Sequence, residues 1–206
     1  RSLAIDPTNP QIVYVGTGGP HNTNVSGAIY KTEDGGKTWR KLNQGADFDF
    51  NIVDLVVDFN SPNIIWACTK YNGGTLYRSA DGGDSWNTVF NETSGGFYDV
   101  EIKPDDSNSV FTGSRGIYRH YLSDGEWNHD HILDGTAYFV RDLVFDPQDP
   151  EILYATWAYS ISGISYLQVA RGISPYSYSD WEFYPVDSQF LTLSVQPTKT
   201  DRLFGG

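Results

Sequence analysis

Three aspartates stand at the same place in three strand-like runs of the chain, where carboxyl groups could do chemistry. Asp54, Asp99 and Asp142 each directly precede the first apolar residue of such a run. Carboxyl groups that converge can bind a cation, raise one another's pKa, or act as acid and base in glycoside cleavage. The alternative is that each carboxylate accepts backbone hydrogen bonds from a neighbouring strand, because buried polar groups need partners. These three residues are the candidate catalytic residues.

Two histidines could bind a metal ion. His129 and His131 flank Asp130, and in a strand they would share one face. A stable metal site needs more than two protein ligands, and no third ligand is evident, so a solvated loop is favoured. The sequence also contains no phosphate-binding loop, nucleophile elbow, CxxC pair or HExxH motif. We therefore predict no metal and no cofactor.

A second group of residues could bind a ligand through stacking and hydrogen bonds. Aromatic rings can stack on sugar rings, and histidine or asparagine can bond hydroxyl groups. The alternative is that these side chains pack neighbouring loops, because exposed aromatics are common on β-surfaces. The candidate ligand-binding residues are His21, Asn22, Asn24, Tyr71, Trp157 and Tyr159. Asn24 and Asn91 also begin N-glycosylation sequons, which are weak signals on their own.

The most regular feature is an octapeptide that occurs twice, 47 residues apart, with the pattern hydroxyl, any residue, Asp, any, Gly, any, hydroxyl, Trp. An Asp in such a turn accepts backbone N–H groups, and the glycine allows a positive φ. The tryptophan then opens the next strand and is expected to bury its ring beside the turn. Turn chemistry explains every position, so we predict a structural role for Thr32, Asp34, Gly36, Thr38 and Trp39, and for Ser79, Asp81, Gly83, Ser85 and Trp86.

The octapeptides belong to a longer repeat. The third copy keeps Asp124 and Trp127, and the fourth keeps only Ser179, Asp180 and Trp181. Each repeat opens with an alternating run that ends in a turn, at 3–10, 55–62, 100–107, 143–150 and 193–200. Second strands are expected at 12–15, 64–68, 110–112, 152–156 and 203–204, with third strands from Gly27, Gly74, Gly116 and Gly163 and fourth strands from Trp39, Trp86, Trp127 and Trp181.

Four short strands in each unit of 40–50 residues are typical of β-propeller blades. We predict an all-β fold, a β-propeller of four-stranded antiparallel blades, with four complete blades and the start of a fifth. The predicted blades span about 1–50, 51–96, 97–138 and 139–190, with a partial fifth at 191–206. The chain is expected to be a single segment of a larger propeller.

Composition narrows the possible partners. The net charge is −12 and the pI is near 4.5, which disfavours nucleic acid and anionic membrane surfaces. No hydrophobic run approaches the roughly 18–20 residues that a membrane span needs, so no membrane insertion is expected. The single cysteine, Cys68, lies in an apolar run and reads as a buried core thiol. The chain has no Met and no signal peptide, so any targeting segment is expected to be missing from it.

The octapeptides match the Asp-box, also called the BNR repeat. Together with the first-repeat segment 4–17, they make the chain resemble the sortilin-type and xyloglucanase-type Asp-box propellers, most sharply over residues 3–90. The resemblance implies propellers of seven to ten blades, usually secreted or at the cell surface. The superfamily includes sialidases, family 74 glycoside hydrolases, sorting receptors and a photosystem assembly factor. The arginines fall in no sialidase motif, and the motifs around the xyloglucanase catalytic aspartates are not matched.

In such a propeller, the loops joining strands two and three share one face with the loops joining consecutive blades. The Asp-box turns lie on the opposite face, so a ligand site is expected away from them. The predicted function is an extracellular or cell-surface module for glycan or protein recognition or scaffolding, whose partners are that ligand and the remaining blades. One alternative is a glycoside hydrolase resembling family 74 xyloglucanases, with acids drawn from Asp54, Asp99 and Asp142 or from Asp47 and Asp49. The other is a purely structural surface protein.

Overall fold

β-strands make up nearly all the regular structure of the computed structural model, apart from the short 3-10 helix η1 (Tyr178–Asp180). The structure describes residues 2–18, 27–42, 51–70, 73–93, 95–134, 138–161, 164–185, 192–196 and 203–205. The chain forms two units, Arg1–Val100 and Glu101–Gly206, and each is described by itself.

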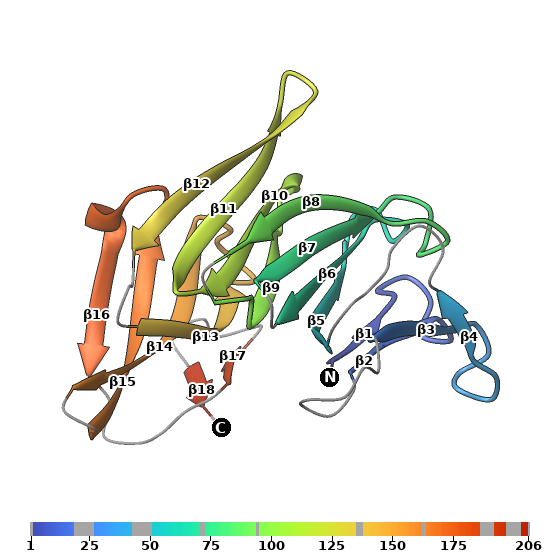
Figure 1. The fold of residues 1–206 in the computed structure, drawn as a ribbon, viewed down its shortest axis with the longest axis horizontal. Coiled ribbons are helices and arrows are strands. Elements are labelled where there is room, and N and C mark those ends of the chain that lie inside the picture. Colours follow the sequence, from blue (N-terminus) through green and yellow to red (C-terminus); the bar gives the residue numbers. More distant parts are fainter. Residues whose placement is uncertain are drawn as a thin grey trace. The chain divides into compact units, whose positions relative to one another are not determined.

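The first unit contains two antiparallel four-stranded sheets (Figure 1). In both sheets the strands follow one another in chain order. The first sheet is β1 (Ser2–Ile5), β2 (Val13–Thr17), β3 (Ala28–Thr32) and β4 (Arg40–Leu42). The second sheet is β5 (Asn51–Val57), β6 (Ile65–Lys70), β7 (Gly74–Ser79) and β8 (Asn87–Glu92).

The remaining strands form two more four-stranded sheets and one strand pair, again in chain order. The third sheet is β9 (Asp99–Lys103), β10 (Asp106–Ser114), β11 (Gly116–Ser123) and β12 (Glu126–Asp134). The fourth sheet is β13 (Tyr138–Phe145), β14 (Ile152–Ile161), β15 (Ile164–Ile173) and β16 (Trp181–Pro185). The pair is β17 (Leu193–Val195) with β18 (Leu203–Gly205).

The predicted fold class is therefore confirmed: the chain is all-β, with four four-stranded antiparallel sheets and the first strands of a fifth. Strand bounds differ from the predicted ones by a residue or two in most places. Four strands differ more. β5 and β13 begin four and five residues before the predicted runs at 55 and 143. β10 and β14 run well beyond 110–112 and 152–156, because both form long hairpins with the following strand. The blade boundaries, and the single larger propeller to which the blades would belong, stay predictions.

In the first, second and fourth blades, a buried aspartate organises the predicted turn after the first strand. Asp6 Oδ1 accepts the backbone N–H groups of Thr8 and Asn9, at 2.8 and 3.1 Å. Asp58 and Asp146 make the same pair of contacts in the second and fourth blades. The third blade has a lysine at this position and closes with a tight turn instead. Lys103 Nζ is buried and pairs with Asp105 at 2.5 Å and with Glu151 at 2.7 Å.

The core of the first unit lies between its two sheets. Tyr14 is central to it, because its ring is buried and its hydroxyl donates to the carbonyl of Gly82 in the second blade at 3.1 Å. The other buried members of this cluster are Ala4, Ile29 and Leu42 from the first sheet and Ile52, Leu55, Ile65, Ala67, Tyr77 and Trp86 from the second.

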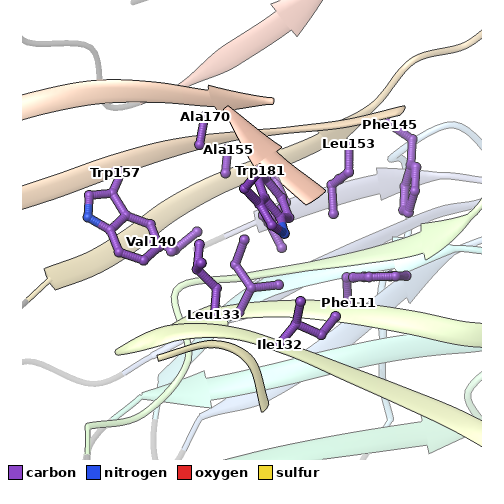
Figure 2. Packing of buried hydrophobic residues seen from close by; sticks show 12 residues of the cluster. Phe111, Ile132, Leu133, Val140, Phe145, Leu153, Ala155, Trp157, Ala170 and Trp181 are labelled. Carbon is purple, nitrogen blue, oxygen red and sulfur yellow. The ribbon is translucent and has the colours of Figure 1, made fainter. Parts of the chain in front are cut away.

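The second unit repeats this arrangement between the third and fourth sheets. Figure 2 shows Phe111, Ile132 and Leu133 on one side, facing Leu153 and Trp181 from the other sheet. The Phe111 ring also meets the Phe145 ring edge-on, with 5.3 Å between centroids. Alternate residues of the inner strands thus fill the space between successive blades, as the period of two in a strand requires.

Candidate functional site

The candidate catalytic aspartates occupy one repeated position at the start of a blade's first strand. In β5 the pairing register shifts between Ile52 and Asp54, and in β13 it shifts between Val140 and Asp142. A β-bulge of this kind inserts one residue and re-aims the side chain that follows it. Asp99 is the first residue of β9. Local sequence alone did not reveal the bulges, because they show only in the register.

Two of these carboxylates accept a hydrogen bond from the first strand of the following blade. Asp54 Oδ2 accepts a hydrogen bond from Val100 N at 3.2 Å, and Asp142 Oδ2 accepts one from Leu193 N. In both cases the donor is the first apolar residue of the next blade's first strand. This is the arrangement that the backbone-acceptor alternative predicts. The carboxylates thereby satisfy an amide that would otherwise be left without a partner near the inner strands.

Asp54 and Asp99 also form a hydrogen bond with each other through their side chains. One of the two carboxyl groups must carry a proton for this contact to exist. Burial raises the pKa of Asp54, which favours the protonated form. Glycosidases hold their two carboxyl groups about 5–5.5 Å or about 6.5–9.5 Å apart, to leave room for the sugar or a water. A pair in direct contact leaves no such room.

Cys68 lies next to this carboxyl pair in the sheet. It stands opposite Asp54 in the pairing of β5 with β6, and it is fully buried. Burial raises the pKa of the Cys68 thiol, and negative charge on the neighbouring Asp54–Asp99 pair raises it further. The thiol therefore stays protonated and unreactive at neutral pH, since the thiolate is the nucleophile. This agrees with the prediction of a core thiol.

The same end of the second blade carries a partly exposed polar edge made by Asn51, Lys70 and Tyr98. Asn51 pairs with Lys70 across β5 and β6, and the Lys70 ammonium lies 3.8 Å from the centre of the Tyr98 ring. Phe97 N donates to the carbonyl of Thr69 at 3.0 Å, which holds this segment over the end of β6. Cations, amides and aromatic rings of this kind can bind sugar hydroxyls and ring faces. Sequence reasoning did not select Lys70 or Tyr98, although Tyr98 directly precedes a candidate acid.

The aromatic candidate Trp157 is buried in the second core. Its exposed fraction is 4%, and it meets the Phe183 ring edge-on with 5.8 Å between centroids. In this position it packs the fourth blade, as the packing alternative predicts. His21, Asn22, Asn24 and Tyr71, the side chain of Tyr159, and Asp47 with Asp49 lie outside the described residues.

The prediction of a loop at His129 and His131 is wrong, because both residues lie within strand β12, where they pair with β11. Their rings have different partners. His129 Nδ1 lies 2.9 Å from Nδ1 of His120, while the His131 ring stacks on Tyr118 with 4.1 Å between centroids. Burial lowers the pKa of His120 to about 3, so this imidazole is neutral. His120 was not selected from the sequence, because only the register of β11 with β12 brings it opposite His129. In the part of the chain that the structure describes, no group of three or more His, Cys, Asp or Glu could hold a metal ion.

The two octapeptides fold into nearly identical turns. Thr32 Oγ1 donates to Asp34 Oδ1 at 2.8 Å and accepts from Gly36 N at 2.9 Å. Asp34 also accepts from Thr38 N at 2.9 Å and from Thr38 Oγ1 at 2.6 Å. Trp39 Nε1 donates to the carbonyl of Gly36 at 3.1 Å. The same five contacts recur in the second turn, among Ser79, Asp81, Gly83, Ser85 and Trp86.

The tryptophans of the two turns differ in exposure. Trp86 is 3% exposed, as expected, whereas the expectation that Trp39 is buried is wrong, because its exposed fraction is 44%. The Trp86 ring packs in the core shared by the first two blades. Trp39 makes the same local hydrogen bond but has no equivalent sheet beside it among the described residues of its unit.

The later turns are built differently. Asp124 and Gly125 both have positive φ, of 54° and 82°, and they connect paired residues Ser123 and Glu126. This is a tight two-residue hairpin turn, so Asp124 supplies backbone conformation here and does not cap amides as Asp34 does. In the fourth blade, Asp180 accepts hydrogen bonds from the Ser177 amide and hydroxyl around helix η1. Trp127 lies within β12 and Trp181 begins β16.

No helix in the described part of the chain is long and apolar enough to cross a membrane. No family model matches the chain.

Two xyloglucanases are similar to this chain in sequence. The xyloglucanase of Hypocrea jecorina is 31% identical over 124 residues, which are 56% of this chain and 14% of the relative. Xyloglucanase Xgh74A of Acetivibrio thermocellus is 32% identical over 97 residues, which are 43% of this chain and 11% of the relative. The matches thus cover a small part of each relative's length.

Solved structures show the same fold over nearly the whole chain. A GH74 enzyme from Niastella koreensis superposes with a TM-score of 0.73 and 21% identity, over 98% of this chain and 33% of that one. YCF48 bound to D1 peptide superposes with a TM-score of 0.57 and 19% identity, over 96% of this chain and 58% of that one. The chain is therefore related over part of its length to GH74 xyloglucanases, and its fold matches part of longer solved structures.

Proposed function

We propose that the protein is a glycoside hydrolase of the xyloglucanase type, and that this chain supplies part of its propeller. The observation that carries the proposal is that two sequence relatives, 31% and 32% identical over the matched residues, are xyloglucanases. The wider fold similarity to GH74 enzymes supports it. Substrate and activity are inferred for the whole protein, of which this chain spans a part.

The polar edge of the second blade is the proposed glycan-contacting region of this chain. It combines the Lys70 ammonium with the Tyr98 ring at 3.8 Å, and Asn51 lies beside them in the register. The Asp54–Asp99 pair lies at the same end and holds the inner strands together, because Asp54 accepts from Val100 N. Since the pair is in direct contact, the reacting acid and base are better sought in the segment containing Asp47 and Asp49.

The test is depolymerisation of xyloglucan by the protein with its natural flanking sequence, followed by reducing-end assays. We expect cleavage, and a loss of about tenfold in apparent affinity for Tyr98→Ala, since about 1.4 kcal/mol of stacking corresponds to tenfold. Asp54→Asn should keep turnover within about twofold, because an amide oxygen still accepts from Val100 N. Asp84→Asn is the control, because Asp84 is exposed in an Asp-box turn. It should change neither the apparent affinity nor the turnover. A protein that binds and cleaves no β-glucan contradicts the proposal.

A second candidate is a recognition module for glycan or protein, secreted or at the cell surface. The direct contact between Asp54 and Asp99 favours it, because these acids are then occupied with each other and with Val100 N. A glycan array with a parallel hydrolysis screen separates the candidates. Binding without cleavage supports the module, cleavage supports the hydrolase, and neither result supports a purely structural protein.

A further inference from the structure

The dipeptide Asp-Gly occurs four times in the chain, and three of its copies lie in described turns. Asp34-Gly35 and Asp81-Gly82 belong to the two Asp-box turns, and Asp124-Gly125 forms the tip of the hairpin that joins β11 and β12 (Figure 1). The fourth copy, Asp134-Gly135, extends outside the described residues. In an Asp-Gly pair the side-chain carboxyl can react with the following backbone amide, because glycine has no Cβ to obstruct the approach. The same chemical pair therefore stands in turns of two different kinds.

In the first Asp-box turn, hydrogen bonds occupy both members of the pair. Asp34 Oδ1 accepts from the Thr32 hydroxyl at 2.8 Å, and Oδ2 accepts from the Thr38 hydroxyl at 2.6 Å. The Thr38 bond contributes most to lowering the pKa of Asp34 to about 2. The amide of Gly35 donates to the carbonyl of Gln11 at 3.0 Å. A Cβ on Gly35 would lie 2.7 Å from Gln11 Oε1, so the turn is also packed at this point.

The second Asp-box turn protects its pair in the same way. Asp81 accepts from the Ser79 and Ser85 hydroxyls at 2.8 and 2.6 Å, and the Gly82 amide donates to the carbonyl of Asn63 at 2.9 Å. The pKa of Asp81 is likewise lowered to about 2, chiefly by the Ser85 hydroxyl. At about pH 5, a carboxyl with such a pKa is protonated in only about one molecule in a thousand. An ionised carboxylate is a poor electrophile, so both Asp-box pairs are protected from this reaction.

The turn at Asp124 lacks this protection. Its carboxylate accepts a long hydrogen bond of 3.4 Å from the adjacent Ser123 hydroxyl, and within the described ranges it accepts none from a backbone amide. Among the same residues, the Gly125 amide donates to no backbone carbonyl. A Cβ on Gly125 would meet no atom within 4 Å, and residues 122–126 are all exposed. The carboxyl and the amide of this pair are thus neighbours in open water.

We propose that Asp124-Gly125 is a site of spontaneous isoaspartate formation in the folded protein, and that their hydrogen bonds keep the two Asp-box pairs from the same reaction. The Gly125 nitrogen attacks Cγ of the protonated Asp124 carboxyl. The N–Cγ bond forms, the Cγ–OH bond breaks, and the amide proton leaves with the hydroxyl as water. Water then opens the cyclic imide. Opening at Cγ restores aspartate, whereas opening at the main-chain carbonyl gives isoaspartate, in which the chain runs through Cβ and Cγ.

The conversion changes the geometry of the hairpin. The pairs Ser123 with Glu126 and Leu122 with Trp127 close directly around the two turn residues. Isoaspartate adds one carbon to the main chain, and a two-residue turn with two positive φ angles has no room for it. The end of the β11–β12 hairpin should therefore fray after conversion, while the Asp-box turns keep their form.

The test ages the folded protein, with its natural flanking sequence, at mildly acidic pH. Peptides from the three turns are separated, and isoaspartate is identified by an isoaspartyl methyltransferase that transfers a labelled methyl group to its free α-carboxyl. We expect isoaspartate at Asp124 to accumulate at least about tenfold faster than at Asp34 or Asp81, because the latter carboxyls stay ionised. The same protein aged in denaturant is the control. There the folded environments are lost, so the three rates should converge.

Thr38→Val is the matched variant, because it removes the hydroxyl that binds Asp34 Oδ2 with little change in shape. It should speed isoaspartate formation at Asp34 and leave the rate at Asp124 unchanged. Equal rates at the three sites in the folded protein overturn the proposal. A difference that persists in denaturant also overturns it, because the neighbouring sequence would then be the cause. An unchanged rate at Asp34 in the Thr38→Val variant overturns the protective role of the Asp-box hydrogen bonds.

Discussion

At the scale of single residues, Asp34 and Asp81 show how much a turn carboxylate does without catalysis. Each accepts two hydroxyl hydrogen bonds and at least one amide hydrogen bond within five residues of chain. These bonds lower the pKa of both carboxyls to about 2. The largest contribution comes from the hydroxyl of Thr38 in the first turn and of Ser85 in the second. A group whose ionised form is this well bonded is a poor proton acceptor at neutral pH, so its role is structural.

Lowering the pH should therefore reduce the free energy of unfolding, because it protonates the Asp81 carboxylate. Its pKa in the folded chain lies below the ordinary value of 3.8, so the ionised carboxylate contributes stability above about pH 4, and that contribution is lost as pH falls toward 2. Asp81→Ala should lower the free energy of unfolding by about 1–2 kcal/mol at pH 7, and the difference should shrink by pH 2. Denaturant unfolding at pH 7, 4 and 2.5 measures this. Asp84→Asn, which breaks only the exposed pair with Arg40, should cost less than about 1 kcal/mol.

Trp39 and Trp86 occupy equivalent positions in the two Asp-box turns, so the stability cost of removing each ring can be compared directly. Trp86→Ala should cost about 3–5 kcal/mol, because it removes a ring that is 3% exposed from the first core. Trp39→Ala in the 206-residue chain should cost less than about 1.5 kcal/mol, because 44% of that side chain is already in water. Urea unfolding of both variants checks the order. Equal costs would mean that Trp39 is packed in solution.

At the scale of strands and turns, the bulged first strand is the element that positions the candidate acids. The extra residue before Asp54 and before Asp142 turns each carboxylate toward the next blade's first amide. The turns at the other end vary more: the third blade closes with Asp124 and Gly125, and the fourth uses a 3-10 helix. Asp142 belongs to the fourth blade, which has lost the Asp-box. The hydrogen bond from this first-strand aspartate to the next blade is therefore retained even where the Asp-box is not.

Removing the Asp142 acceptor should loosen the start of β17. In Asp142→Ala, the amide of Leu193 loses its partner, so its hydrogen exchange should accelerate by about tenfold, the equivalent of about 1.4 kcal/mol. Asp142→Asn keeps an acceptor oxygen and should leave the rate within about threefold. Amide exchange followed by NMR measures both variants. Acceleration spread evenly over β13 and β14 would indicate general destabilisation and argue against this local contact.

At the scale of the molecule, stability rests on packing between successive blades, within each of the two units. In the first unit, Tyr14 and Leu42 reach the Asp-box turn of the second blade, while in the second unit Phe111 and Phe145 join the third and fourth blades. Each sheet is covered on one face by its neighbour, so a blade without a neighbour has an unprotected apolar face. The exposed Leu3 and Ile5 follow from this rule.

Glycine substitutions should isolate this inter-blade packing. Gly83 and Gly36 both have a φ of 92°, so an alanine is strained equally at either position. Only Gly83 also faces Leu42, where the added Cβ would lie 2.5 Å from Cδ1. Gly83→Ala should therefore cost about 1–3 kcal/mol more than Gly36→Ala. Thermal unfolding of the two variants in the 206-residue chain measures the difference, and equal midpoints would show that backbone strain alone acts.

The sequence by itself determined the repeat, the strand order and the turn chemistry. The Asp-box and the turn after each first strand use hydrogen bonds between residues two to four positions apart, as in Asp6 with Thr8 and Asp34 with Thr38. Interactions of such short range depend on the local residue types, so they can be read from a pattern. The alternation of apolar residues then gave the strands and the fold class.

Only the tertiary structure decided which side chains meet across strands and blades. The Asp54–Asp99 contact, the His120–His129 contact and the burial of Trp157 depend on register, bulges and sheet packing, which join residues far apart in the chain. Trp39 and Trp86 have the same local sequence pattern and the same local hydrogen bond, yet one is exposed and the other buried. The physical reason is that local geometry sets a residue's conformation, whereas burial is set by the neighbouring blade.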